Sequence, residues 1–287
     1  MSLWTPAIDH LIEAALTEDI GHGDITTENL ISPEMTGEGQ IVAKEPCVLA
    51  GLEIANRVFT RLDDAIKISS SYRDGDPIHI GDVVLTARGS LQGLLIGERS
   101  ALNFLQRLSG IATLTRTFAD RLSGRKTRVV DTRKTTPGWR VLEKYAVRMG
   151  GGENHRTGLY DGVLIKDNHI AVCGGIGPAV KAARQRISHL VKIEVEASNL
   201  TEVQDALTAG ADVIMLDNMV LPEIKEAVTL IQGRALVEAS GNVTIDSLIP
   251  LADAGVDIIS VGALTHSAKS VDLSMRIKAK DPGVNSR

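Results

Sequence analysis

The segment 131–170 combines side-chain types that together can hold a small polyanion. Two apolar runs within it, in VVDTRK and GVLIKDNH, end in cations, and the GGGENHR loop between them adds an imidazole and more positive charge. The residues concerned are Arg133, Lys134, His155, Arg156 and Lys166. A chain with a net charge of -5 has no general reason to gather cations at strand ends. A small polyanionic substrate is such a reason.

Later in the chain, apolar runs end first in carboxylates and then in small turns. Glu194 and Glu196 alternate in one run, and Asp217 ends the next. The turns after the last two runs contain Ser240, Gly241, Asn242, Val261, Gly262 and Ala263. Backbone N–H groups of glycine-containing turns can approach a phosphate, and carboxylates suit ribose hydroxyls or Mg²⁺. The whole set predicts a phosphorylated sugar that meets a second anionic substrate.

Each of these residues also has a purely structural explanation. Arg133 and Lys134 are equally consistent with exposed charges after a strand, and His155 with a cap on a buried backbone group. Because a strand repeats every two residues, Glu194 and Glu196 share one face. They either point into the site or pair with cations of neighbouring strands, and the sequence leaves open which of the two faces the site.

The elements that must position these residues alternate regularly after residue 124. Strand-like runs and helical stretches follow one another, which is typical of βα units with a parallel sheet. The expected strands are residues 127–132, 162–167, 191–198, 211–217, 235–240 and 256–262. The repeated AG-(A or V)-D motif marks a tight helix-to-strand turn and favours a barrel. We predict an α/β fold with an incomplete parallel barrel of about six strands and the site at the strands' C-terminal ends.

The first part of the chain has a different pattern. An amphipathic helix over residues 3–16 is followed, within residues 37–89, by short strand-like runs around a helical stretch. This pattern predicts a small α+β domain. A long helical pattern over residues 94–122 then connects to the barrel, with Gly110 inside it as a break or a point of close packing.

Composition excludes several classes of function. Cys47 and Cys173 form no metal or disulfide spacing, and neither a signal segment nor a long uncharged apolar window is present, so we expect a soluble cytoplasmic protein. Interspersed charges of both signs argue against nucleic acid or a membrane as partner. The chain has no GxxxxGK(S/T), GxGxxG, HExxH or CxxC motif, which disfavours P-loop enzymes, Rossmann dehydrogenases and a permanent transition-metal site.

The chain resembles the quinolinate phosphoribosyltransferase family over nearly its whole length. The resemblance is carried by GERSALNFLQRLSGIAT, DTRKTTPGWRVLEKYAVRMGGGENHR, GLYDGVLIKDNHI, IEVEAS, IMLDN, EASGNV and SVGALTHSA. It implies transfer of a 5-phosphoribosyl group from phosphoribosyl pyrophosphate to the quinolinate nitrogen with loss of the 2-carboxylate. The products are nicotinate mononucleotide, pyrophosphate and CO₂, in NAD biosynthesis.

The resemblance also implies an architecture. It implies an N-terminal sandwich-like α+β domain over residues 1–110, a catalytic barrel over 111–270, and a tail or helix over 271–287 that packs back on the N-terminal domain. It further implies a homodimer with shared active sites, which can associate into a hexamer.

Site residues follow from the resemblance position by position. The implied quinolinate site consists of Thr132, Arg133, His155, Arg156 and Lys166, with Arg99 entering from a partner subunit. The implied phosphoribosyl pyrophosphate site consists of Lys134, Glu196, Asp217, Ser240, Gly241, Asn242, Val261, Gly262 and Ala263. Glu196 and Asp217 would also hold a transient Mg²⁺, and the catalytic residues would be Lys134, Lys166, Glu196 and Asp217.

Three rival functions are consistent with parts of this pattern. A related group linked to molybdenum uptake shares the architecture with a different substrate, although the IKDNH and NHR strings favour quinolinate. A barrel aldolase would use Lys166 for a Schiff base. A phosphoribosyl sensor without catalysis would not need every reaction partner, and the complete set of charges from Arg99 to Asp217 argues against it.

Overall fold

The computed structural model describes residues 5–279, and these residues form two compact units. Unit 1 contains residues 5–114, 136–151 and 268–279, and unit 2 contains residues 115–135 and 152–267. The start of the expected opening helix and the end of the expected tail, residues 3–4 and 280–287, lie outside the described residues. The domain boundaries expected from the sequence stay predictions.

Unit 2 is built on a parallel sheet. Within the described residues this sheet has six strands in the order β6-β11-β10-β9-β8-β7. They are β6 (Arg128–Val130), β7 (Val163–Ile165), β8 (Ile193–Ala197), β9 (Val213–Asp217), β10 (Leu236–Ser240) and β11 (Ile258–Ser260). The predicted α/β class with an incomplete barrel is therefore confirmed, since the described edge strands β6 and β7 are not paired with each other.

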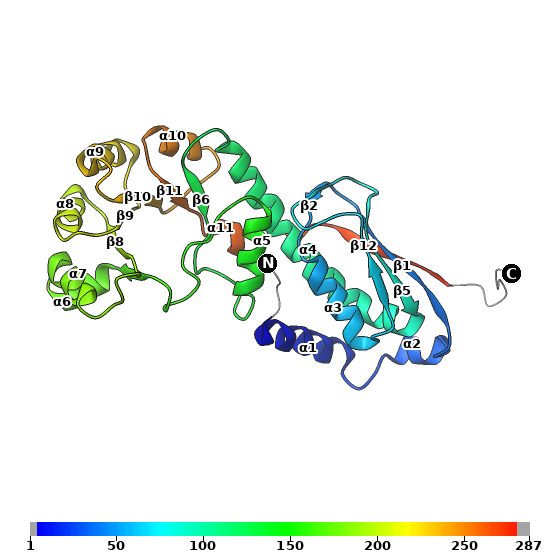
Figure 1. Cartoon of the computed structure of the whole chain (residues 1–287). Coiled ribbons are helices and arrows are strands. Elements are labelled where there is room, and N and C mark those ends of the chain that lie inside the picture. Colours follow the sequence, from blue (N-terminus) through cyan, green and yellow to red (C-terminus); the bar gives the residue numbers. More distant parts are fainter. Residues whose placement is uncertain (1–4, 280–287) are drawn as a thin grey trace. The chain divides into compact units, whose positions relative to one another are not determined.

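Helices cover the outer face of this sheet (Figure 1). They are α6 (Asp167–Cys173), α7 (Ile176–Arg184), α8 (Leu200–Thr208), α9 (Leu221–Ile231) and α10 (Leu248–Asp253). The short helix α11 (Ala263–His266) follows β11. Gly210 and Gly255 of the two AG-(A or V)-D motifs have φ values of 78° and 93°. This left-handed conformation favours glycine and turns each helix directly into the next strand.

A loop after α5 borders the free edge of β6. Glu153 forms an isolated parallel bridge with Val130, and the buried carboxylate of Asp131 accepts a hydrogen bond of 3.0 Å from the His155 amide. The Asn154 side-chain amide donates to the same carboxylate. These contacts set the backbone of the NHR segment beside the end of β6.

Unit 1 contains an antiparallel sheet in the order β12-β1-β5-β3 among the described residues. Its strands are β1 (Thr36–Ala43), β3 (Lys67–Ser69), β5 (Val83–Ser90) and β12 (Leu273–Ala279), and a separate pair consists of β2 (Cys47–Val48) and β4 (Pro77–Ile78). The helices of unit 1 include α1 (Pro6–Ile20), α2 (Ile25–Leu30), α3 (Leu52–Leu62) and α5 (Arg140–Met149). Residues 273–279 thus form a strand, not a helix, and pair with β1.

The long helix α4 (Leu91–Arg121) runs without a break through Gly110. A Cβ atom at position 110 would lie 2.0 Å from the backbone oxygen of Lys269. Gly110 is therefore the point of close packing that the sequence left as one of two alternatives. None of the helices in residues 5–279 is long and apolar enough to cross a membrane.

Glu143 of α5 is the centre of a buried polar network in unit 1. Its fully buried carboxylate accepts hydrogen bonds from the Arg107 guanidinium at 2.9 Å and the Thr136 hydroxyl at 2.8 Å. We expect Glu143→Gln to lower the free energy of unfolding by about 2 kcal/mol, because one of these charge-assisted bonds is lost in a buried site. Chemical denaturation measures this change.

The control for this substitution is Glu38→Gln. Glu38 pairs with Arg88 at 2.7 Å, but 58% of the Arg88 side chain is exposed. An exposed pair contributes at most about 1 kcal/mol, so the control should change stability less. Equal effects of the two substitutions would contradict the assignment of Glu143 as a stabilising centre.

Candidate active site

A cavity of about 610 Å³ lies at the C-terminal ends of the barrel strands. Most residues that the sequence suggested for a site line it, namely Thr132, Arg133, Lys134, His155, Arg156, Lys166, Glu196, Asp217, Ser240, Gly241 and Asn242. They come from strands β8, β9 and β10, from the loops after β6, β7 and β10, and from the loop after α5. The elements of unit 2 therefore bring together side chains that are up to 110 residues apart in the sequence.

Arginine side chains supply much of the positive charge of this cavity. The Arg156 guanidinium donates a hydrogen bond of 3.0 Å to the backbone oxygen of Gly162, which fixes its direction. Burial, and next the nearby charge of Arg133, lower the pKa of Arg156. Arg133 is thus close enough to Arg156 for both guanidinium groups to act on one anion, and an anion between them relieves their repulsion.

Lys166 adds an ammonium group from the end of β7. It is the residue that precedes α6, and its Nζ lies 2.7 Å from Glu196 Oε2. Glu196 is on β8, so this ion pair connects the basic and acidic sides of the cavity. Side-chain exposures of 45% for Lys166 and 18% for Glu196 leave the pair accessible to a ligand.

The turns after β9 and β10 interlock at the acidic side. Asn218 and Asn242 have positive φ values of 55° and 48°, and the side-chain amide of Asn242 donates to Asn218 Oδ1 at 3.2 Å. A Cβ atom at Gly241 would lie 2.1 Å from Asn218 Oδ1. The Asn218 amide donates to Asp217 Oδ2 at 2.8 Å. A glycine is thus required where these turns meet, and the Asp217 carboxylate is held in place.

The loop after β11 supports Lys134 and does not line the cavity. Thr265 Oγ1 donates a hydrogen bond of 2.7 Å to the backbone oxygen of Lys134. A Cβ atom at Gly262 would lie 3.0 Å from Lys134 Cδ, so Gly262 leaves room for this side chain. Val261, the third residue of interest in this loop, is buried at 2% exposure. The predicted phosphate contacts of Val261, Gly262 and Ala263 stay predictions.

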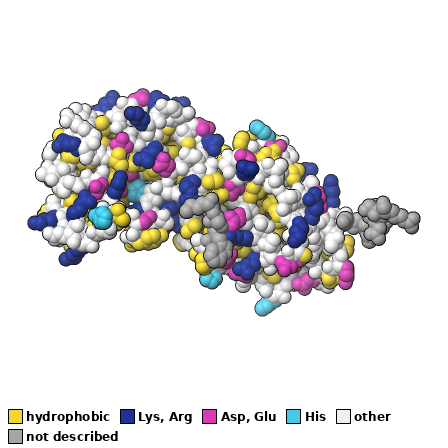
Figure 2. All heavy atoms as spheres, in the orientation of Figure 1, with side chains coloured by type: hydrophobic (Ala, Val, Ile, Leu, Met, Phe, Trp, Pro, Cys, Tyr) yellow, Lys and Arg dark blue, Asp and Glu magenta, His cyan; other side chains and the backbone are white. Residues whose placement is uncertain are grey.

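Arg99 lies in unit 1, exposed on α4. Its expected role at the cavity of a partner subunit stays a prediction. Charged side chains of both signs are interspersed over the face that Figure 2 shows.

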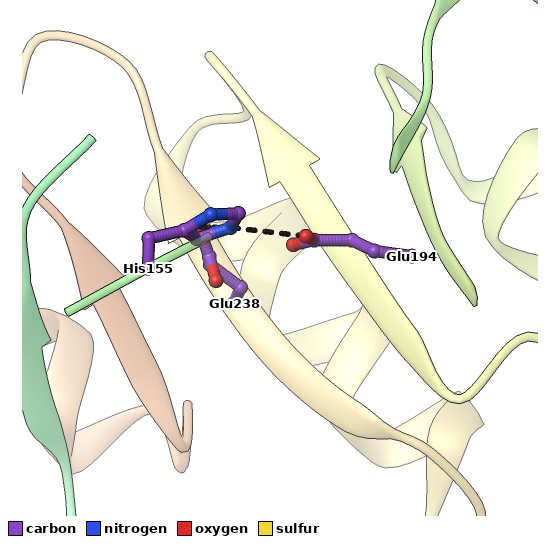
Figure 3. A group of neighbouring side chains, drawn as sticks. All are labelled: His155, Glu194 and Glu238. Atoms are coloured by element: carbon purple, nitrogen blue, oxygen red, sulfur yellow. Dashed lines mark hydrogen bonds and ion pairs between the residues drawn. The ribbon is translucent and has the colours of Figure 1, made fainter. Parts of the chain in front are cut away.

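A buried cluster of His155, Glu194 and Glu238 lies inside the barrel (Figure 3). The backbone N–H of Arg156 donates to His155 Nδ1 at 2.8 Å, so the ring hydrogen is on Nε2. Nε2 lies 3.0 Å from Glu194 Oε2 and 3.6 Å from Glu238 Oε1. Both ring nitrogens therefore contact protein groups, and the contact of Nε2 with Glu194 is shorter than its contact with Glu238.

The two glutamates that the sequence could not tell apart have different surroundings. Both point into the barrel, as their period of two requires. Glu196 lines the cavity at the strand ends, whereas Glu194 is buried against His155 and borders a second cavity deeper in the barrel. Glu196 is the glutamate that faces the candidate active site.

Burial, and next the carboxylate of Glu194, raise the pKa of Glu238 far above its usual range. The folded protein then binds this proton more tightly than the unfolded chain. The stabilisation that Glu238 contributes is therefore lost as the pH rises above about 4.3. Glu238→Gln removes the titrating group and with it this part of the pH dependence. We expect the stability of this variant relative to wild type to rise with pH, by up to about 1.4 kcal/mol per pH unit.

Thermal unfolding from acidic to mildly alkaline pH tests this expectation, with Glu153→Gln as the matched control. The Glu153 side chain is 52% exposed and pairs with Arg128, so its substitution should not change the pH dependence. A constant difference in unfolding temperature between wild type and Glu238→Gln would show that Glu238 is not preferentially protonated in the folded protein.

Several residues of the cavity were not predicted as site residues. Glu238, Met215, Leu164, Asn218 and Ser260 also line it. Glu238 lies two residues before Ser240 in β10, so the same period of two that placed Glu194 and Glu196 could have placed it inside. The same period also places Leu164 and Met215 inside, two residues before Lys166 and Asp217, but their apolar side chains look like ordinary core residues in a strand.

Comparison with known proteins agrees with this geometry. The model of the quinolinate phosphoribosyl transferase C-terminal domain matches residues 111–276, and that of the N-terminal domain matches residues 24–109. The chain is 46% identical over 274 residues to the probable nicotinate-nucleotide pyrophosphorylase (carboxylating) of Bacillus subtilis, covering 96% of this chain and 94% of the relative. It is 41% identical over 286 residues to quinolinate phosphoribosyltransferase (decarboxylating) 2a of Nicotiana tabacum, covering 93% and 81%.

The fold has solved counterparts as well. The crystal structure of NadC from Streptococcus pyogenes matches with a TM-score of 0.94 at 43% identity, covering 98% of this chain and 100% of that chain. Both domain models, in order, and relatives of nearly full length agree with the cavity described above. The chain belongs to the quinolinate phosphoribosyltransferase family.

Proposed function

We propose that the chain transfers the 5-phosphoribosyl group of phosphoribosyl pyrophosphate to the ring nitrogen of quinolinate, with loss of the 2-carboxylate. The observation that carries this proposal is a single cavity with guanidinium and ammonium groups on one side and carboxylates and glycine turns on the other. A rigid dicarboxylate and a phosphorylated sugar need these two kinds of surface side by side. The names of the relatives refer to the same reaction.

Quinolinate would bind on the basic side. Arg133 and Arg156 can each offer two N–H groups to a carboxylate, and Lys166 adds a point charge. The His155 ring uses both nitrogens within the protein, so we assign it to orienting the NHR segment while no substrate is bound. A carboxylate of quinolinate would have to replace the Glu194 contact to reach His155 Nε2.

Phosphoribosyl pyrophosphate would bind on the acidic side. Ser240, Gly241 and Asn242 would receive the 5-phosphate, because the positive φ of Gly241 turns the chain sharply at the end of β10. Lys134 would face the pyrophosphate. Its backbone is fixed by Thr265, which leaves the exposed ammonium free to reach the donor.

Glu196 and Asp217 fit an Mg²⁺ ion that accompanies the donor. Both carboxylates line the cavity and offer the hard oxygen ligands that this ion prefers. The ion, when bound, would neutralise charge that develops on the departing pyrophosphate. Glu196 would have to exchange its contact with Lys166 for the ion, which would release the ammonium group towards quinolinate.

The reaction needs positioning and charge stabilisation more than covalent catalysis. Positive charge develops at the anomeric carbon as pyrophosphate leaves, and the carboxylates of the cavity would stabilise it. The quinolinate nitrogen attacks from the opposite face, so no nucleophilic side chain is required. An aldolase would need Lys166 Nζ to attack a carbonyl carbon, but Nζ is held 2.7 Å from Glu196 Oε2 in an ion pair.

We further propose that the active unit is a homodimer in which Arg99 of one subunit reaches the cavity of the other. Its exposed position on α4 is consistent with an intermolecular contact. Association of dimers into a hexamer and a cytoplasmic location are the further expectations that accompany this proposal.

The direct test mixes the pure protein with Mg²⁺, phosphoribosyl pyrophosphate and quinolinate, and follows CO₂ and nicotinate mononucleotide. A parallel reaction with nicotinate in place of quinolinate is the control for substrate choice. We expect equal amounts of both products from quinolinate and none from nicotinate. Consumption of nicotinate with no consumption of quinolinate would show that the substrate is wrong.

A further inference from the structure

Glu238 lies where two cavities of the barrel meet. A second cavity of about 470 Å³ is lined by residues at the N-terminal ends of the strands, such as Arg128 and Leu236. His155, Arg156 and Glu238 line both this cavity and the one at the C-terminal ends. Bulky apolar side chains normally fill the centre of a parallel barrel. Here a layer of titratable side chains separates the candidate active site from a second space.

The contacts of this layer place a proton on Glu238. His155 Nε2 donates to Glu194 Oε2. Burial, and next the charge of Glu194, raise the pKa of Glu238. The Glu238 side chain is only 2% exposed, and its Oε1 has no hydrogen-bond partner among the described residues. The ligand atoms of the three side chains lie within 4.8 Å of one another, a distance at which two buried carboxylates do not both ionise.

The other charged groups around the layer do not change this assignment. Arg156 lies close enough to Glu194 for the two charges to attract each other, although burial and the charge of Arg133 lower the pKa of Arg156 overall. Ser260 of β11, beside β10, offers Glu238 a neutral hydroxyl and no charge. A dianionic substrate in the cavity would add negative charge and favour the protonated form of Glu238 further.

Decarboxylation creates a need for such a proton. When the bond between ring C2 and its carboxylate breaks, CO₂ leaves and the electron pair stays on C2, beside the cationic ring nitrogen. CO₂ can be recaptured until a proton reaches C2. A guanidinium group is not deprotonated in proteins, so the arginines of the cavity are poor proton donors. Glu238 is a carboxyl group of the cavity whose pKa is raised by burial and next by the charge of Glu194.

We propose that the Glu238 carboxyl protonates C2 of the decarboxylated ring and regains its proton from water through the second cavity. This inference rests on the proposed function. The Oε–H bond of Glu238 breaks, the C2–H bond forms, and Glu238 is left as a carboxylate until water reprotonates it. Glu194 and His155 are positioning residues. His155 holds the Glu194 carboxylate in place, and the charge of this carboxylate keeps the proton on Glu238 before the reaction.

The test separates the two halves of the reaction in the first turnover. Wild type, Glu238→Gln and Glu153→Gln are mixed with Mg²⁺, phosphoribosyl pyrophosphate and quinolinate labelled in the 2-carboxylate, and pyrophosphate and labelled CO₂ are measured after rapid quenching. We expect Glu238→Gln to release pyrophosphate at close to the wild-type rate but CO₂ roughly 100-fold more slowly. The carboxylated mononucleotide should accumulate. Glu153→Gln makes the same chemical change at the exposed rim of the second cavity and should behave as wild type.

Two outcomes would overturn the inference while leaving the proposed function intact. One is CO₂ release from Glu238→Gln at the wild-type rate, and the other is equal slowing of pyrophosphate and CO₂, which would show a role in binding. Wild type that releases no pyrophosphate would instead overturn the proposed function itself. Wild type in D₂O provides a measurement that needs no variant: slowing confined to CO₂ release supports the proposal, and its absence overturns it.

A divalent cation is the competing occupant of this cluster. The imidazole and the two carboxylates are close enough to share an ion. Equilibrium dialysis of wild type and Glu238→Gln with Zn²⁺ or Mn²⁺ alone decides between a bound cation and a proton on Glu238. An ion that binds wild type at this position and is lost from the variant would overturn the role of Glu238 as an acid, because its oxygens would then be metal ligands. Equal binding by both proteins supports the proposal.

Discussion

Replacement of Arg133 by alanine should weaken quinolinate binding by roughly 100-fold or more, since truncation of a partly buried charged partner costs about 2–5 kcal/mol. Arg133 lies in the loop after β6 and lines the cavity beside Arg156. Its guanidinium can pair with a rigid carboxylate through two parallel hydrogen bonds. The affinity for phosphoribosyl pyrophosphate should change much less. Calorimetric titration of each substrate into the folded variant measures both.

Arg128→Ala is the matched control for this experiment. Arg128 begins β6, the strand that precedes Arg133, but its side chain is 45% exposed and pairs with Glu153 at the other end of the barrel. Its loss should leave quinolinate affinity unchanged. Unchanged quinolinate affinity in Arg133→Ala would remove Arg133 from the quinolinate site.

Asp217→Asn should slow phosphoribosyl transfer by roughly 100- to 1000-fold at saturating substrates, the range for loss of one preorganised electrostatic contact. The substitution keeps the shape of the side chain but removes the negative charge that, in the proposed function, stabilises the ribosyl cation and holds Mg²⁺. Asp217 accepts a hydrogen bond from Asn218 at 2.8 Å, so its carboxylate is already oriented before substrate binds. Single-turnover release of pyrophosphate measures the transfer step.

Asp253→Asn makes the same change at a site with no role in the reaction. Asp253 pairs with Arg125, and 61% of its side chain is exposed. This variant should transfer at the wild-type rate. If Asp217→Asn also does so once the substrates are saturating, then the charge at position 217 contributes to binding only, and its assigned role in the transfer step is wrong.

The strands of the barrel and their inward-facing residues could be predicted because side chains alternate between the two faces of a strand, and the sequence shows this period of two. Glu194 and Glu196 illustrate the limit of this pattern. The period places both inside the barrel, but their depth along the barrel axis depends on how neighbouring strands are aligned, and Glu194 pairs with Val213 while Glu196 pairs with Met215. That alignment is a property of the folded sheet, and only the structure separates the two roles.

Loops were less predictable than strands. The turn at Gly262 follows the last barrel strand and contains a glycine, which is typical of a phosphate site. This glycine also leaves room for Lys134, and its predicted phosphate contact stays a prediction. A glycine signals only that a backbone or side chain approaches closely. Helix α6 was also not predicted, because Asp167 and Asn168 are poor helix formers and the helix begins directly after Lys166.

The pairing of β12 with β1 has a consequence for how the chain folds during synthesis. Gly37 pairs with Ala279 and Ala43 with Leu273, so β1, close to the beginning of the chain, needs a partner from close to its end. Until that partner leaves the ribosome, one edge of β1 presents unpaired backbone groups, which are a template for aggregation. Contacts of such long sequence separation form slowly. Unit 1 can therefore be completed only once β12 has been synthesised, later than the early position of β1 in the sequence suggests.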